Sequence, residues 1–147
     1  MAWVEKSVLV PYSCQQMFAL VDGVAAYPEF LPWCGGSEVV DVSDAVIHAS
    51  VLIDYHGIKQ RFTTENTRQP PDFIGITLQD GPFRHLDGGW RFVPLSESAC
   101  KVEFKLHYEF SSRLLETLVG PVFHHVANSF VEAFVLRAEK IYGVAFI

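Results

Sequence analysis

The sequence predicts an α+β domain in which a curved antiparallel sheet of six to seven strands wraps around a long C-terminal helix, with a short helical segment after the first strand. Two observations predict this fold class. Apolar and polar residues alternate across much of residues 37–110, which is the period of strands with one buried face. From residue 112 onward apolar residues recur at helical spacing. The length of 147 residues suits a single domain over residues 1–147, since one domain commonly takes about 150 residues.

The first part of the chain predicts a strand followed by a short helix. Residues 3–10 mix β-branched residues with partial alternation, which is typical of a strand. Ser13 and Gln16 form a capping-box pattern, in which each side chain bonds to the backbone N–H of the other residue. Apolar residues at helical spacing follow, so we expect a helix that ends near Gly23.

The prolines of residues 27–36 predict the end of helical structure, because proline lacks a backbone N–H and disfavours helix at the residue before it. The same segment carries Tyr27, Phe30 and Trp33 and is too aromatic for a solvated loop. Two interpretations stay open. The segment is either a lid over the mouth of a cavity or an Ω-loop packed on its own side chains.

The middle of the chain predicts antiparallel strands separated by turn signals. In the clearest strand, residues 100–110, six apolar residues alternate without exception with polar ones. The pair His56-Gly57 predicts a tight turn between two strands. The expected strands cover residues 47–55, 59–67, 73–78, 89–93 and 100–110.

The C-terminal part predicts one long amphipathic helix. Apolar side chains from Leu115 to Phe134 fall on one broad stripe. The pair Gly120-Pro121 is expected either to kink the helix or to restart it with Pro121 in its first turn. The helix should end just before Gly143.

Charge and cysteine content exclude several classes of protein. The chain carries 11 basic and 17 acidic residues, a net charge of −6, which argues against a general DNA- or RNA-binding surface. Its three cysteines form no CxxC pair, so a reducing compartment is the simpler interpretation. The sequence shows neither a secretion signal nor an apolar run of about 18 residues. We therefore expect a cytoplasmic protein, with at most peripheral contact with the inner membrane through Trp3, Trp33 or residues 144–147.

A curved sheet and a straight helix do not match in shape, so side chains alone must fill the wedge between them. The chain is 14% aromatic, and rings around such a wedge would line a cavity suited to an apolar ligand. Trp90 has the strongest claim to a binding role, because its indole N–H adds a polar group to an apolar wall. For any single side chain ordinary core packing is the favoured interpretation, and the case for binding depends on the whole set together with the fold. The candidate cavity residues are Phe30, Leu31, Trp33, Phe62, Phe83, Trp90, Phe92, Phe104, Phe123, Val126 and Phe130.

Several stretches resemble one known family in their order and spacing across residues 7–143. They include Val10-Pro11-Tyr12-Ser13, Tyr27-Pro28-Glu29-Phe30-Leu31-Pro32, Asp80-Gly81-Pro82-Phe83, Gly89-Trp90-Arg91-Phe92 and Gly120-Pro121-Val122-Phe123. The pattern is similar to the START-like family of bacterial ribosome association toxins and mitochondrial coenzyme Q-binding proteins, within the polyketide cyclase/dehydrase (SRPBCC, Bet v 1-like) superfamily. This resemblance implies the helix-grip fold.

The resemblance implies two roles of different kinds. The role that we expect is non-enzymatic binding of an apolar ligand, ubiquinone or a similar polyisoprenoid lipid, in the cavity between sheet and helix, in support of respiration. The alternative is binding to the large ribosomal subunit, which would block subunit association and inhibit translation. An aromatic polyketide cyclase or dehydrase activity ranks third. No cofactor is expected apart from such a lipid, bound as a ligand.

The residues themselves predict neither a catalytic nor a metal site. None of the common nucleophile or metalloprotease motifs occurs in the sequence. Asp54, His56 and Arg61 could meet near one hairpin, but cross-strand pairing on the surface explains them equally well. The histidines outside the C-terminal helix are scattered, without an acidic or cysteine partner at ligand spacing: His48, His56, His85 and His107.

Overall fold

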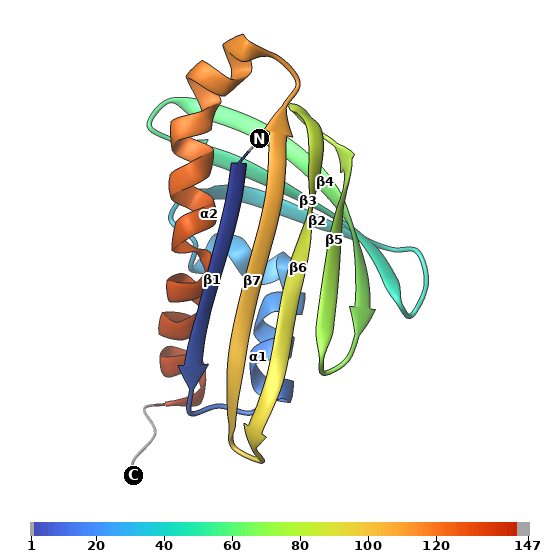
Figure 1. The fold of residues 1–147 in the computed structure, drawn as a ribbon, viewed down its shortest axis with the longest axis vertical. Coiled ribbons are helices and arrows are strands. Elements are labelled where there is room, and N and C mark those ends of the chain that lie inside the picture. The colour runs from blue at the N-terminus through green and yellow to red at the C-terminus, as the bar shows by residue number, and fades with distance from the viewer. Residues whose placement is uncertain (1, 144–147) are drawn as a thin grey trace.

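The fold is an α+β arrangement of one antiparallel sheet and the helices that cover it, seen in a computed structural model that describes residues 2–143 (Figure 1). Met1 and the apolar tail of residues 144–147 lie outside the described residues. In chain order the elements are β1 (Ala2–Val10), α1 (Cys14–Asp22), the 3-10 helix η1 (Val24–Glu29), β2 (Cys34–Asp41), β3 (Val46–Tyr55), β4 (Ile58–Gln69), β5 (Phe73–Asp80), β6 (Phe83–Ser96), β7 (Ala99–Phe110) and α2 (Arg113–Tyr142).

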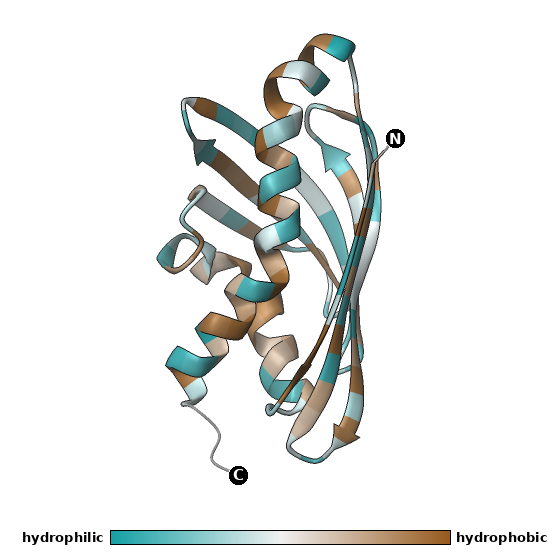
Figure 2. Cartoon of the chain, turned by 60° about the vertical axis from the view of Figure 1, so that its left-hand side comes forward, coloured by the Kyte–Doolittle hydropathy of each residue, from teal (hydrophilic) through white to brown (hydrophobic). Residues whose placement is uncertain are grey.

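The seven strands of the described chain form one sheet in the order β1-β7-β6-β5-β4-β3-β2, and each neighbouring pair is antiparallel. The strands from β2 to β7 follow one another as hairpins, whereas β1 returns to pair with β7. The sheet curves around α2, so that strands lie on either side of this helix (Figure 2). The prediction of a curved sheet around a long C-terminal helix is confirmed.

Side-chain alternation gives the sheet a buried concave face and a more polar convex face. The six apolar residues of β7 from Cys100 to Phe110 are all buried, as the alternation predicts. The residues between them, such as Lys105 and His107, point to the opposite face. On the helix side, Phe123 and Phe134 of α2 are buried within the same core. The core therefore lies between α2 and the concave face.

Gly88 of β6 lies where the backbones of β6 and β7 approach closely. A Cβ atom at this position would lie 2.0 Å from the carbonyl oxygen of Lys105 and 2.9 Å from the Cα of Leu106. Shifts in strand register near both ends of β6, at residues 83–85 and 94–96, bend this strand further. A missing side chain and two irregularities thus help the sheet to curve.

Caps and long-range hydrogen bonds fix both helices. The predicted capping box is present, with the Ser13 hydroxyl accepting from the Gln16 N–H at 3.1 Å and the Gln16 side chain accepting from the Ser13 N–H at 2.9 Å. Ser112 caps α2 by accepting a hydrogen bond from the backbone N–H of Leu115. Near the other end of α2, the Tyr142 hydroxyl donates to the carbonyl oxygen of Gln16 at 2.9 Å and so connects α2 to α1.

One expectation about prolines was wrong, and one of the two alternatives at Pro121 is excluded. Pro28 lies inside η1, so helical structure continues past Gly23 as a 3-10 turn. A 3-10 helix accepts this proline because short runs with i→i+3 bonds tolerate the loss of one N–H. The helix α2 also runs without interruption through Pro121, which excludes the alternative that the helix restarts there.

None of the helices that the structure describes combines the length and the apolar sequence that a transmembrane span requires.

Candidate functional site

An interior cavity lies between the concave face of the sheet, α2 and the segment around η1. Its volume is about 60 Å³, which is room for roughly two water molecules at ~30 Å³ each. Its walls come from η1, the loop after it, five strands and α2. The lining residues are Val24, Tyr27, Trp33, Ala49, Val51, Phe62, Thr64, Asn66, Ile76, Leu86, Trp90, Phe104, Leu106, Phe123, Phe130 and Phe134.

Six of the eleven predicted cavity residues line this space, and the other five do not. Trp90 is central, with its ring centroid 4.5 Å from Phe104 and 5.3 Å from Phe134. This wall of rings is the arrangement that the wedge argument predicts, although the wedge itself is filled more completely than expected. The six residues that line it are Trp33, Phe62, Trp90, Phe104, Phe123 and Phe130.

Phe83 and Phe92 belong to solid core rather than to the cavity wall. Phe83 stacks among other rings at one end of the cavity, 4.9 Å from both Phe110 and Phe123 between centroids. Phe92 packs edge-on against Phe18 of α1, with 5.8 Å between centroids. Phe92 points inward as strand periodicity predicts, and Phe83 is turned inward by the register shift between Phe83 and His85. Neighbouring rings occupy the space in front of both side chains.

The remaining three predicted residues are also packed against protein. Leu31 and Val126 are fully buried in the core, at 1% and 0% exposure, and do not border the cavity. Phe30 lies further out on the segment after η1, where the guanidinium carbon of Arg137 is 4.8 Å from the centre of its ring. Phe30 therefore lines an outer groove instead.

Sequence reasoning missed the polar part of the cavity. Thr64 and Asn66 are both buried on β4, at 7% and 8% exposure, and both line the cavity. The Thr64 hydroxyl donates a hydrogen bond of 2.7 Å to Asn66 Oδ1. The structure shows no hydrogen bond from the Asn66 amide nitrogen to another described residue. The signal in the sequence was the i, i+2 spacing of Phe62, Thr64 and Asn66, which share one strand face.

Trp33 separates the cavity from a larger groove on the surface. It lines both spaces and is only 3% exposed, with its ring centroid 5.3 Å from that of Phe130. The outer groove has a volume of about 440 Å³ and runs between the segment after η1 and α2. Trp33 of this segment borders both spaces, as the lid interpretation requires, and both interpretations of residues 27–36 stay predictions.

The chemistry of the cavity is that of binding rather than of acid–base reaction. Among the described residues that line it, Tyr27 is the one that can lose a proton. Burial raises the pKa of Tyr27 above its ordinary value, and nearby Asp22 and Cys34 raise it further. Its hydroxyl donates to the carbonyl oxygen of Val21. A phenol held in this way stays protonated and is engaged with the backbone.

The convex face holds a group of residues that sequence reasoning considered scattered. His85 and Asp87 of β6 and His107 of β7 lie together, with one potential ligand atom from each within 4.8 Å of the others. The expectation that no acidic residue accompanies these histidines was therefore wrong for His85 and His107. The i, i+2 spacing of His85 and Asp87 was a signal, but strand register was needed to add His107.

Comparisons with known proteins agree with this geometry. The family described as "Polyketide cyclase / dehydrase and lipid transport" matches residues 10–135. The ribosome association toxin RatA of Vibrio cholerae is 48% identical, over 97% of this chain and 99% of that protein. A mitochondrial coenzyme Q-binding protein of Xenopus laevis is 32% identical, over 94% of this chain and 58% of that protein.

A solved structure gives the same fold. The Zhui aromatase/cyclase from Streptomyces superposes with a TM-score of 0.82, covering 95% of this chain and 94% of that one, at 15% identity. At such low identity the similarity concerns the fold alone. The two sequence relatives above are named as a toxin and a binding protein, not as enzymes, in agreement with the expected non-enzymatic role.

The fold, the aromatic cavity and the sequence relatives all indicate the same family. An aromatic cavity under a long helix is the geometry that the resemblance to the START-like family implied, and the matched relatives cover nearly the whole chain. The chain belongs to the polyketide cyclase/dehydrase and lipid-transport family and, within it, to the START-like proteins of the RatA and coenzyme Q-binding type.

Proposed function

We propose that the chain binds an apolar ligand with a polar ring, of the isoprenoid quinone class, between the sheet and α2. The observation that carries the proposal is an aromatic cavity with one buried polar pair, Thr64 and Asn66. Apolar walls with a few fixed polar groups are the usual composition of small-molecule sites. The name of the Xenopus laevis relative, a coenzyme Q-binding protein, supports the same ligand class.

The polar pair fits the carbonyl oxygen of a quinone. The Asn66 amide nitrogen can donate a hydrogen bond to it, while Thr64 holds the amide by donating to Oδ1. Trp90 and Phe104 border the same space and offer ring faces for stacking. A saturated lipid without a carbonyl would leave the Asn66 donor unpaired, which disfavours it by the cost of a buried unsatisfied group.

The lid has to move before such a ligand can enter. Sites for drug-sized ligands measure about 300–1,000 Å³, whereas the closed cavity measures about 60 Å³. Rotation of Trp33 would join it to the outer groove of about 440 Å³. The loss of the Trp33 contact with Phe130 opposes this opening. Burial of apolar ligand surface, which stabilises the complex by roughly 25 cal/mol per Å², offsets the loss of this contact.

The first experiment measures quinone binding directly. Lipid is extracted from the purified protein and identified by mass spectrometry, and the stripped protein is titrated with a short-tailed ubiquinone. Trp33 and Trp90 line the cavity, so binding should quench their fluorescence; a Trp3→Phe background removes the signal of Trp3, which is 68% exposed. We expect saturable quenching and a bound quinone in the extract. Neither lipid nor saturable quenching would overturn the proposal.

Matched asparagine variants separate the polar pair from the rest of the protein. Asn66→Leu keeps the size of the side chain and removes the donor, so the affinity for ubiquinone should fall about three- to tenfold. Asn128→Leu is the control, because Asn128 is half-buried on α2, does not line the cavity and donates a hydrogen bond to the carbonyl oxygen of His124. Equal affinities for both variants would contradict the role of Asn66.

Association with the ribosome is the second candidate function. The observation that favours it is the 48% identity to a protein named ribosome association toxin over almost its whole length. The net charge of −6 requires that such binding use a local surface. The surface to test first is a cleft of about 590 Å³ beside the start of α2, next to the exposed Leu114. Arg84 and Arg113 line it together with Glu109 and Glu116, and Arg84 pairs with Glu109 at 3.4 Å.

Sedimentation tests this second candidate. The protein is mixed with purified large ribosomal subunits and run through a density gradient at low and at high salt. We expect co-sedimentation at low salt, weakened by Arg113→Glu and unchanged by Arg91→Glu, since Arg91 does not line this cleft and lies seven residues along β6 from Arg84. Absence of co-sedimentation at low salt would exclude ribosome association.

The two candidate functions also imply different locations for the protein. Ribosome binding would occur in the cytoplasm, and quinone exchange would occur at the surface of the inner membrane.

A further inference from the structure

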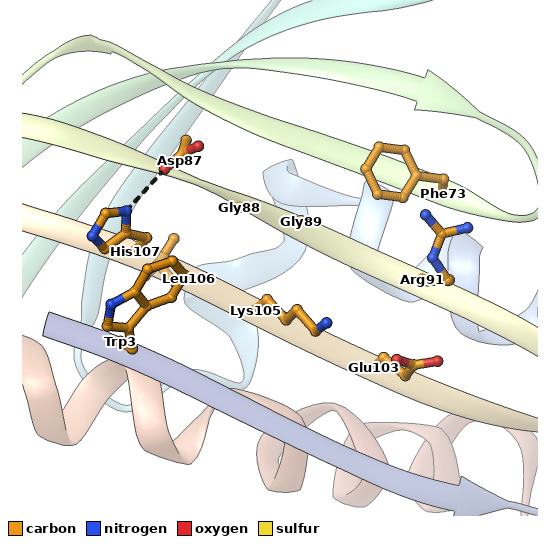
Figure 3. A pocket seen from close by; sticks show the side chains of 10 residues that line it. All are labelled: Trp3, Phe73, Asp87, Gly88, Gly89, Arg91, Glu103, Lys105, Leu106 and His107. Atoms are coloured by element: carbon orange, nitrogen blue, oxygen red, sulfur yellow. Dashed lines mark ion pairs between the residues drawn. The ribbon is translucent and has the colours of Figure 1, made fainter.

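We propose that His85, Asp87 and His107 form a binding site for a divalent transition-metal ion of the zinc type on the convex face of the sheet. The three side chains come from the paired strands β6 and β7. They lie on the opposite face from the apolar cavity, so the proposal is independent of the proposed function. Figure 3 shows Asp87 and His107 beside each other, at one end of a surface hollow.

Strand register brings the three residues together. Asp87 pairs directly with His107 across the antiparallel ladder, and His85 precedes Asp87 by two residues on the same face. Leu86 lies between them in sequence and is 3% exposed on the concave face, which confirms the direction of its two neighbours. The pairing of β6 with β7 therefore fixes the backbone positions from which all three side chains extend.

The distances are close to those of a tetrahedral metal site. His85 Nε2 lies 2.7 Å from Asp87 Oδ1, and His107 Nδ1 lies 3.7 Å from the same oxygen. Zinc–ligand bonds of about 2.0–2.1 Å place neighbouring ligand atoms about 3.4 Å apart. The two imidazole rings are 4.9 Å apart between centroids and inclined by 67°. Small side-chain rotations would bring the three ligand atoms to a common distance from one ion.

Protein hydrogen bonds leave this group unsatisfied. Asp87 Oδ1 and His107 Nε2 are both shielded from solvent and have no hydrogen-bond partner in the described chain. The His85–Asp87 contact of 2.7 Å is short but lacks the alignment of a hydrogen bond. Buried polar atoms without partners are unusual and costly in folded proteins. A metal ion would satisfy the Asp87 oxygen and bind one nitrogen of each histidine. With His107 bound through Nδ1, its Nε2 would carry the ring proton and is not satisfied by the ion.

Trp3 of β1 holds one of the proposed ligands in position. Its ring stacks on the His107 imidazole at 3.8 Å between centroids and 9° between planes. This contact restricts rotation of His107 and covers it with apolar surface, as the surroundings of metal ligands commonly do. It also gives a structural reason for a tryptophan that is 68% exposed.

The donor set indicates the class of ion. Two imidazole nitrogens and one carboxylate oxygen suit Zn²⁺, Co²⁺ or Ni²⁺, whereas Ca²⁺ and Mg²⁺ prefer oxygen ligands alone. Three protein ligands leave a fourth position for water or an anion. Lys105 and Arg91 line the same hollow of about 310 Å³ as Asp87 and His107, and would attract an anionic fourth ligand (Figure 3).

Metal titration tests the proposal. Full-length protein without a histidine tag is treated with a chelator, dialysed, and titrated with ZnCl₂ in a calorimeter and with CoCl₂ in an absorption spectrometer. We expect one Zn²⁺ per chain and visible Co²⁺ bands typical of tetrahedral coordination. His85→Ala should weaken Zn²⁺ binding by at least about tenfold. His48→Ala is the matched control, because His48 also lies beside a carboxylate, at 3.3 Å from Glu65.

The variants distinguish a metal site from a simple ion pair. Circular dichroism verifies that each variant is folded, and Asp87→Asn provides a second test that keeps the size of the side chain. Loss of Zn²⁺ binding in His85→Ala and Asp87→Asn, but not in His48→Ala, supports the site. Absence of saturable Zn²⁺ binding in the unmodified protein, or equal loss in all three variants, overturns it.

Discussion

Gly88 illustrates how one missing side chain shapes the sheet. Replacing this glycine should lower the stability of the fold. Gly88→Ala would place a methyl group 2.0 Å from the carbonyl oxygen of Lys105, so β6 and β7 would have to separate. We expect a loss of about 2–3 kcal/mol in the free energy of unfolding, as for other overpacked sites. Urea denaturation of wild type and variant measures it.

Gly36→Ala is the matched control for this substitution. A Cβ at Gly36 would meet nothing within 4 Å, and Gly36 lies on the edge strand β2. Its stability should change by less than about 1 kcal/mol. Similar losses for Gly88→Ala and Gly36→Ala would show that close approach at Gly88 does not matter.

The buried thiols predict how stability depends on alkaline pH. Burial raises the pKa of Cys100 from its usual 9.0 to about 12, and contact with Cys14 contributes in the same direction. Between these values the unfolded chain loses the proton while the folded chain keeps it, so unfolding becomes more favourable as pH rises. Urea midpoints should fall from pH 9 toward pH 11, and fall less steeply in Cys100→Ala. A flat profile in the wild type would contradict this.

At the scale of elements, α1 supports the end of α2 through the bond from Tyr142 to Gln16. The capping box should therefore contribute to the stability of the whole fold. Ser13→Ala removes the hydroxyl that accepts from the Gln16 N–H, and should cost about 1 kcal/mol in thermal or urea unfolding. Ser13→Thr should retain most of the stability. Ser98→Ala, in an exposed turn, should change stability by no more than about 0.5 kcal/mol.

The segment that begins with η1 contributes differently from the other elements. It supplies Tyr27 to the cavity wall and ends at Trp33, which borders both the cavity and the outer groove. Its residues Tyr27 and Trp33 are buried and Phe30 is half-buried, yet its conformation depends on a single short 3-10 helix and a loop. It is the element whose movement the quinone proposal requires, while the strands and α2 keep their positions.

At the scale of the whole molecule, stability should be distributed unevenly across the sheet. β7 lies inside the sheet with half of its side chains buried, whereas most of edge strand β2 is exposed. We expect amides of β6 and β7 to exchange hydrogen only on global unfolding, and those of β2 to exchange by local opening. Hydrogen exchange followed by mass spectrometry measures both. Equal protection of β2 and β7 would contradict the prediction.

The sheet also divides the molecule into two chemically different faces. The concave face and α2 enclose rings and the Thr64–Asn66 pair, which suits an apolar ligand. The convex face brings His85, Asp87 and His107 to the surface. Since the two groups extend from opposite sides of the same strands, substitutions at one should leave binding at the other unchanged.

The local patterns of this chain were predictable from the sequence. The alternation of residues 100–110 determined which side chains of β7 are buried, and Ser13 with Gln16 marked the start of α1. Both signals depend on geometry within a few residues, which every strand or helix shares. The inward direction of Phe83 and Phe92 was likewise correct.

What only the tertiary structure decided is which inward side chains meet empty space and which outward ones meet each other. Phe92 faces the ring of Phe18, whereas Phe62 borders the cavity, although strand periodicity points both inward. Phe83 points inward out of step with Leu86, Trp90 and Phe92, through the register shift between Phe83 and His85. His107 joins Asp87 only through the register of β6 and β7. Periodicity fixes the direction of a side chain, but its neighbours are set by strand pairing and packing between residues distant in the sequence.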